Sequence, residues 1–91
     1  MSARLDVAMP TYDESLAITT ELIRRHVEGD RAIRPADHIM NDLGLDSLNL
    51  MELVADIEGR FEIDIPTEMF DHLATVDDVA KAILVLKSTG A

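Results

Sequence analysis

The residues best suited to chemistry lie in one stretch, Asn41-Asp42-Leu43-Gly44-Leu45-Asp46-Ser47-Leu48, which precedes the most regular helical pattern of the chain. Gly44 favours a turn there, and Asp46 is a good helix cap because its carboxylate accepts amide protons of the first turn. With Asp46 as the cap, the Ser47 hydroxyl is free and points outward. A phosphodiester on that oxygen would be an anion at the positive end of a helix, where anions are stabilised. The stretch therefore predicts that Ser47 is a covalent attachment point.

Two other roles for Ser47 have less support. A Ser that only caps a helix favours Glu or Gln three residues later, and Leu50 stands there instead. A catalytic Ser needs a base and an oxyanion hole, but no Gly-x-Ser-x-Gly turn surrounds Ser47. The three histidines, His26, His38 and His72, are scattered and lack the spacing of metal ligands. We therefore expect no catalytic residue, no metal site and no enzymatic activity.

A first helix is predicted over residues 13–28, followed by a long connection. Thr11 and Glu14 have the spacing of a capping box, and Gly29 is a typical helix terminator. A core-facing stripe is expected at Leu16, Thr20, Ile23 and Val27. Residues 30–45 then form a connection, with or without a short helical turn near residues 35–39. Four apolar residues can pin it to the core: Ile33, Ile39, Leu43 and Leu45. A connection this long in a small domain usually serves a function.

The second helix is predicted over residues 47–61 and has apolar residues on two sides. The buried side is expected to contain Leu50, Leu53, Val54, Ile57 and Phe61, which share an arc of roughly 100°. Leu48 and Met51 project outside this arc, next to Glu52. Two large apolar side chains on the solvent side of a helix require a reason other than core packing.

A short third helix is predicted over residues 67–73 and a last helix over residues 75–87. Pro66 precedes the short helix, and Thr75 with Asp78 three residues later caps the last one. The last helix is expected to bury Val76, Val79, Ala80, Ile83 and Leu86. Residues 61–65 alternate but have no second strand to pair with, so the fold class is all-α. We expect one domain over residues 11–88, after a flexible tail of residues 1–10.

The formal net charge is -10, and Arg60 is the only Arg or Lys between residues 36 and 78. Such a charge argues against nucleic acid and anionic membranes as partners and favours basic protein patches, although it also serves solubility. Residues 82–86, the longest apolar run, are too few to span a bilayer, and no signal core is visible, so a cytoplasmic location is expected. The chain contains no cysteine, so any thiol must come from a cofactor.

The stretch around Ser47 and its surroundings resemble the acyl carrier proteins. The resemblance rests on residues 41–48, on Met51-Glu52-Leu53-Val54, on Phe61 and on Ile65-Pro66, and it extends through residues 75–79. An Asp-Ser-Leu tripeptide alone is a weak signal, but together with these downstream residues it is a strong one. The resemblance implies a four-helix acyl-carrier-type bundle with a short third helix and a long loop between helices 1 and 2.

The resemblance also implies a function for each part of the second helix. Ser47 would carry 4'-phosphopantetheine, transferred from coenzyme A by a phosphopantetheinyl transferase, which makes the chain a phosphoprotein. Asp46 and Leu48 would belong to the recognition signature, and Leu48, Met51, Glu52, Asp56 and Glu58 would bind partners. The protein would be a monomeric carrier of acyl thioesters in fatty acid, lipid or polyketide-type biosynthesis. Its partners would include synthases, acyltransferases and acyl-ACP synthetase with basic docking patches.

Departures from the family pattern suggest a specialised member and leave one competing hypothesis open. Asn49 and the Gly59-Arg60 pair stand where acidic residues are common, and Asp56 stands where a small apolar residue is usual. The competing hypothesis is an acidic helical protein-interaction module without a prosthetic group, which the same charge pattern would serve. The intact mass of the chain after exposure to a transferase distinguishes the two.

Overall fold

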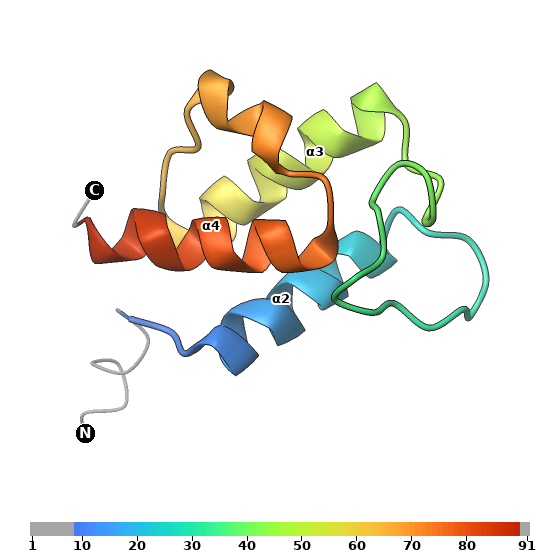
Figure 1. Cartoon of the computed structure of the whole chain (residues 1–91), viewed down its shortest axis with the longest axis horizontal. Helices are drawn as coiled ribbons and strands as arrows, with labels where there is room; N and C mark the ends of the chain where they lie inside the picture. Colours follow the sequence, from blue (N-terminus) through green and yellow to red (C-terminus); the bar gives the residue numbers. More distant parts are fainter. Residues whose placement is uncertain (1–8, 90–91) are drawn as a thin grey trace.

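The described part of the chain contains four helical segments and the loops that join them (Figure 1). The computed structural model describes residues 9–89. They comprise α2 (Tyr12–Arg24), α3 (Ser47–Phe61), the 3₁₀ helix η1 (Thr67–His72) and α4 (Val76–Ser88). Within residues 9–89 the only β-type pairing is an isolated bridge between His38 and Thr75. The predicted all-α bundle with a short third helix and a long loop is therefore confirmed, whereas most of the predicted tail lies outside the described residues.

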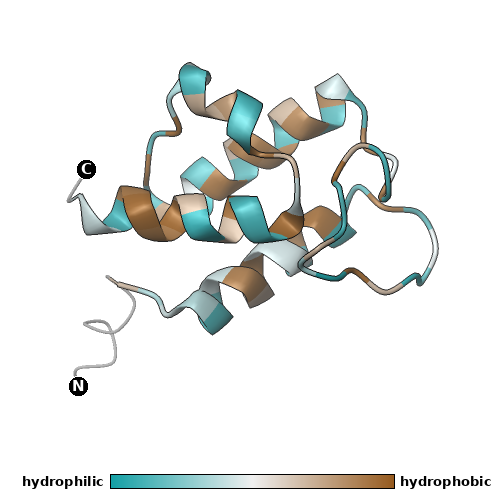
Figure 2. Ribbon diagram, in the orientation of Figure 1, coloured by the Kyte–Doolittle hydropathy of each residue, from teal (hydrophilic) through white to brown (hydrophobic). Residues whose placement is uncertain are grey.

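The core forms where the apolar sides of the helices meet, with α2 packed against both α4 and α3. Figure 2 shows apolar and hydrophilic residues alternating along each helix, as expected for helices with one side inside. The largest fully buried apolar side chains are Leu22, Ile23, Ile39, Leu53, Ile57, Val76, Val79 and Ile83. All five residues predicted to be buried in the last helix are buried. Of the five predicted for α3, only Leu50 remains partly exposed.

The buried side of α2 differs from the predicted one. Ser15, Thr19, Leu22 and Ile23 are buried, whereas Leu16, Thr20 and Val27 of the predicted stripe are only half-buried. The Ser15 hydroxyl donates a 2.8 Å hydrogen bond to the backbone oxygen of Ala80, so this polar side chain is satisfied inside the α2–α4 contact. Hydropathy alone does not reveal the partner of Ser15, and Thr19 is buried although its hydroxyl has no hydrogen-bond partner within the described residues.

The end of α2 is also earlier than predicted, at Arg24 instead of residue 28. The amides of His26 and Val27 bond to carbonyls three residues back, which tightens the chain into turns. The side chain of Arg24 then donates to the backbone oxygen of Arg31, and this holds the chain where it leaves the helix. Gly29 adopts a positive φ of 80° within the loop, so it serves a turn and not the helix end.

The long connection of residues 25–46 is ordered by hydrogen bonds and by apolar anchors. Of the four predicted anchors, Ile39, Leu43 and Leu45 are buried, whereas Ile33 is only half-buried. The amide of Ile39 donates a 2.8 Å hydrogen bond to the backbone oxygen of Ala74, and the amide of His38 donates a 2.7 Å hydrogen bond to Asp42 Oδ2. The chain near residues 35–39 forms turns and no helix. The loop therefore forms a fixed end of the bundle, beside the starts of α3 and α4 (Figure 1).

A polar cluster joins the start of α2 to α4. The hydroxyl of Tyr12 donates a hydrogen bond to Asp77 Oδ1, and Lys81 Nζ lies 2.9 Å from Asp77 Oδ2. The bond from Tyr12, and next the bond from Lys81, hold the pKa of Asp77 below its usual value of 3.8. A carboxyl group with a pKa lowered by folding stabilises the fold above its unfolded pKa, and this contribution is lost as the pH falls.

We therefore expect Tyr12→Phe to destabilise the protein in a pH-dependent way. The difference in unfolding free energy between wild type and variant should be largest near neutral pH, where Asp77 is ionised. It should shrink as the pH falls below the unfolded pKa of 3.8, because Asp77 then takes up its proton in both proteins. Urea unfolding followed by circular dichroism at several pH values measures it. In the Asp77→Asn background this pH dependence should vanish, and a difference that is equal at all pH values would contradict the assignment.

Candidate functional site

The start of α3 is capped by Asp46, as the sequence predicts. Asp46 Oδ1 accepts a 2.8 Å hydrogen bond from the amide of Asn49, and Asn49 Oδ1 accepts a 3.5 Å bond from the amide of Asp46. Together they form a capping box. Sequence reasoning missed this role of Asn49, because capping boxes usually contain Glu or Gln at that position. The spacing of three residues after Asp46 was the available signal.

Because Asp46 and Asn49 cap the helix, the Ser47 side chain is not needed for capping. Ser47 is exposed, and within residues 9–89 its hydroxyl makes no hydrogen bond. It is the first residue of α3, so it lies at the positive end of the helix dipole. Ser47 is therefore exposed to solvent, as the sequence predicts.

The approach to Ser47 is fixed on its N-terminal side. Leu43 and Leu45 are buried and flank the exposed Gly44. Gly44 has a φ of 80°, and a Cβ built there would meet nothing within 4 Å. Glycine is thus favoured at this position by the backbone conformation and not by a lack of space. Two apolar anchors and one left-handed turn therefore place the first turn of α3 at the surface.

The charges around Ser47 suit an anionic group. The first turn of α3 contains no acidic residue, whereas the first turns of α2 and α4 each contain two: Asp13 and Glu14 in α2, and Asp77 and Asp78 in α4. The nearest carboxylate in sequence, that of Asp46, is directed to the amide of Asn49. A phosphodiester on Ser47 would therefore meet helix amides and no carboxylate from its own first turn.

Apolar side chains lie exposed next to Ser47. Leu48 is 67% exposed and Met51 is 50% exposed, and Ala55 one turn further is also exposed. Met40, in the loop before α3, is 39% exposed. The sequence predicted that Leu48 and Met51 lie outside the core, and this is confirmed. They provide an apolar contact surface at the start of α3.

The three predicted partner-binding carboxylates occupy two different environments. Glu52 and Asp56 lie on the side of α3 that faces the end of α2, with oxygens 3.8 and 3.6 Å from the nitrogens of His26. Glu58 is half-buried, and its Oε2 accepts a 2.8 Å hydrogen bond from the amide of Ile65. Glu58 thus holds the connection between α3 and η1. The sequence placed these carboxylates correctly on α3 but missed both sets of partners.

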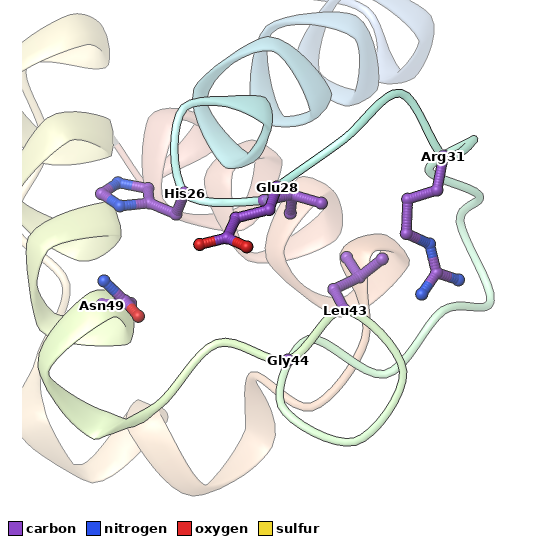
Figure 3. A pocket seen from close by; sticks show the side chains of 7 residues that line it. His26, Glu28, Arg31, Leu43, Gly44 and Asn49 are labelled. Atoms are coloured by element: carbon purple, nitrogen blue, oxygen red, sulfur yellow. The ribbon is translucent and has the colours of Figure 1, made fainter.

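A pocket of about 480 Å³ lies between the end of α2, the loop and the start of α3. It is lined by His26, Val27, Glu28, Arg31, Leu43, Gly44 and Asn49 (Figure 3). The carboxylate of Glu28 lies between His26 and Leu43, and Arg31 stands on the opposite wall. Among residues 9–89, no three His, Asp or Glu side chains are grouped so that they could hold a metal ion. Within the same residues, no helix has the length and apolarity needed to cross a membrane.

Comparisons with known proteins agree with this geometry. The family model for the phosphopantetheine attachment site matches residues 20–83. The acyl carrier protein of Campylobacter jejuni strain RM1221 is 35% identical over 79 residues, which cover 87% of this chain and 99% of that protein. The acyl carrier protein of Streptomyces coelicolor is 48% identical over 48 residues, which cover 53% of this chain and 52% of that protein.

These matches decide between the two hypotheses that the sequence left open. The family model spans α3 and η1 entirely, residues 76–83 of α4 and the end of α2 from residue 20, so it includes part or all of every helix described. An interaction module without a prosthetic group does not account for a match of this extent to an attachment-site family. The chain therefore belongs to the phosphopantetheine-binding acyl carrier protein family, as a carrier with a 4'-phosphopantetheine prosthetic group and not as an enzyme.

Proposed function

We propose that this protein carries acyl intermediates as thioesters on a 4'-phosphopantetheine arm attached to Ser47. The observation that carries the proposal is that Ser47 is exposed at the start of α3. Its hydroxyl is not needed to cap the helix, because Asp46 and Asn49 form the capping box. A phosphopantetheinyl transferase would join that oxygen to the pantetheine-bearing phosphorus of coenzyme A, while the pyrophosphate bond of coenzyme A breaks, adenosine 3',5'-bisphosphate leaves and the hydroxyl proton is released. The prosthetic group then supplies the thiol, which this cysteine-free chain does not have.

The chain's own residues would hold and present the attachment point without performing the chemistry. The positive end of α3 would offset the charge of the phosphodiester. Asp46 would keep the first turn closed through its bond to the amide of Asn49. Leu43 and Leu45 would keep the loop fixed, so that successive partners meet Ser47 in the same position. The proposed carrier domain spans residues 11–88.

The proposed partners are enzymes with basic docking patches: the transferase, synthases, acyltransferases and acyl-ACP synthetase of fatty acid, lipid or polyketide-type biosynthesis. The net charge of -10 supports this, because it attracts cationic surfaces and speeds their encounter. Leu48 and Met51 would form the apolar centre of the contact, with Glu52 and Asp56 at its edge. Glu58 would contribute less, since one of its oxygens already accepts a bond from Ile65. We propose that the carrier acts as a monomer in the cytoplasm.

Intact-mass spectrometry tests the proposal. The purified protein would be incubated with coenzyme A and a broad-specificity phosphopantetheinyl transferase. We expect its mass to rise by one phosphopantetheinyl group and the loaded protein to gain one titratable thiol. A protein that stays bare, or that gains more than one group, would contradict the proposal.

A further inference from the structure

His26 lies against the acidic edge of the proposed docking helix. Its Nδ1 is 3.8 Å from Glu52 Oε1 and its Nε2 is 3.6 Å from Asp56 Oδ2. Glu52 and Asp56 are four residues apart, so both face the same side of α3. The imidazole is only 13% exposed, whereas the side chains of Glu52 and Asp56 are 54% and 37% exposed. The ring, in the turn that follows α2, therefore packs behind the two carboxylates, which stay exposed to solvent.

The ring is held near both carboxylates without a hydrogen bond to either. Its Nε2 is buried and has no hydrogen-bond partner within the described residues. The next charged groups along the α2–α3 contact are Arg60 and Glu21, which lie 4.0 Å apart and balance each other. On the other side, Glu28 and Arg31 line the pocket that His26 also lines (Figure 3). Glu52 and Asp56 are therefore the charges that the ring faces on α3, and Glu28 and Arg31 are the charged residues of the loop that line the same pocket.

We propose that His26 competes with the cationic side chains of docking partners for the carboxylates of Glu52 and Asp56. The inference rests on the proposed function, because it requires that basic partners dock on α3. Imidazole is the side chain that ordinarily changes charge between about pH 5 and 8. When neutral, it leaves two carboxylates for Lys or Arg side chains of the partner. When protonated, it pairs with them and removes one unit of negative charge from the edge.

The partner that fits this edge presents two cationic groups spaced for carboxylates one helical turn apart. Each exposed charge pair contributes little to the binding free energy of such a partner. Competition from His26 should therefore change the strength of docking by a modest factor. We expect the effect mainly in the rate of encounter, which depends on the charges at the rim.

Loading of the apo protein by a phosphopantetheinyl transferase with a basic surface serves as the probe. The value of kcat/KM is measured at about pH 8 and about pH 6 for wild type, His26→Gln and His26→Lys. Ratios between variants at one pH cancel the pH dependence of the transferase itself. The ratio of wild type to His26→Gln should be near one at the higher pH and fall about two- to fivefold at the lower pH. His26→Lys, which is always cationic, should be slow at both.

Two controls separate competition from a merely structural role. His72 is exposed on η1, so His72→Gln should leave the ratio to wild type independent of pH. In the Glu52→Gln/Asp56→Asn background, the identity of residue 26 should no longer affect loading. Melting curves at both pH values identify any variant that has lost its fold. If one of His26→Gln and His26→Lys has done so, the other is compared with wild type.

The outcomes distinguish this inference from the proposed function. A ratio of wild type to His26→Gln that does not change with pH would overturn the inference while loading continues. So would a His26→Lys protein that loads as fast as His26→Gln, or a Glu52→Gln/Asp56→Asn protein that loads as fast as wild type. A wild-type protein that is never loaded would overturn the proposed function, and the inference with it.

Discussion

Ser47→Ala is expected to abolish loading and to leave the fold intact. The hydroxyl is exposed and makes no hydrogen bond within residues 9–89, so its removal leaves no buried group unsatisfied. Asp46 and Asn49 continue to cap α3, and Ala is at least as good a helix former as Ser. The intact mass should therefore stay unchanged after incubation with coenzyme A and transferase, while the melting temperature stays close to that of wild type.

Ser88→Ala provides the matched control. Ser88 is also an exposed Ser in a helix, at the last residue of α4, where its hydroxyl donates to the oxygen of Val85. This variant should load like wild type. Loading of Ser47→Ala at the wild-type rate would mean that another hydroxyl accepts the group, and the assignment of the site would be wrong.

Leu53→Ala is expected to have the largest effect on stability. The Leu53 side chain is 0% exposed and belongs to the core between α3 and the other helices. Truncation of a buried Leu removes apolar contacts and leaves a cavity, which costs about 2–5 kcal/mol of unfolding free energy. Such a loss is a large part of the total for a domain of this size. Chemical denaturation followed by circular dichroism measures it.

Leu48→Ser is the comparison on the opposite side of the same helix. Leu48 is 67% exposed, so the substitution should change the unfolding free energy by less than about 0.5 kcal/mol. It should instead slow loading by the transferase or later acyl transfer, because an exposed apolar contact is lost. Equal destabilisation by Leu53→Ala and Leu48→Ser would show that the two sides of α3 are assigned wrongly.

The parts of the fold that local patterns determine could be predicted from the sequence. The limits of α3, its cap at Asp46 and the Thr75 cap of α4 follow from residue types within one helical turn. The buried side of α4 follows from apolar residues at helical spacing, since Val76, Val79 and Ile83 are all enclosed. In these elements, the local preference and the tertiary packing agree.

The parts that depend on distant partners could not be predicted. Ser15 is buried because its hydroxyl reaches the oxygen of Ala80, far along the chain. Beyond the early end of α2, the side chain of Arg24 donates to the backbone oxygen of Arg31 across the loop. The periodicity of hydropathy contains no information on either bond. The predicted buried stripe and the predicted end of the first helix therefore both differ from those of α2.

The departures of α3 from the family pattern also have structural partners. Asn49 bonds to Asp46, Asp56 lies beside His26, and Arg60 lies 4.0 Å from Glu21 of α2. Two of the three departures thus occur where α3 faces α2. The contact between the two helices therefore changes the charge that α3 presents to solvent.

Peptide mass spectrometry of the loaded wild-type protein tests the central claim most directly. After incubation with coenzyme A and transferase, the protein would be cleaved and the phosphopantetheinyl group located by fragmentation. We predict one modified residue, Ser47, with every other Ser and Thr bare. A group found on any other residue, or a Ser47 peptide that remains unmodified throughout, would contradict the account.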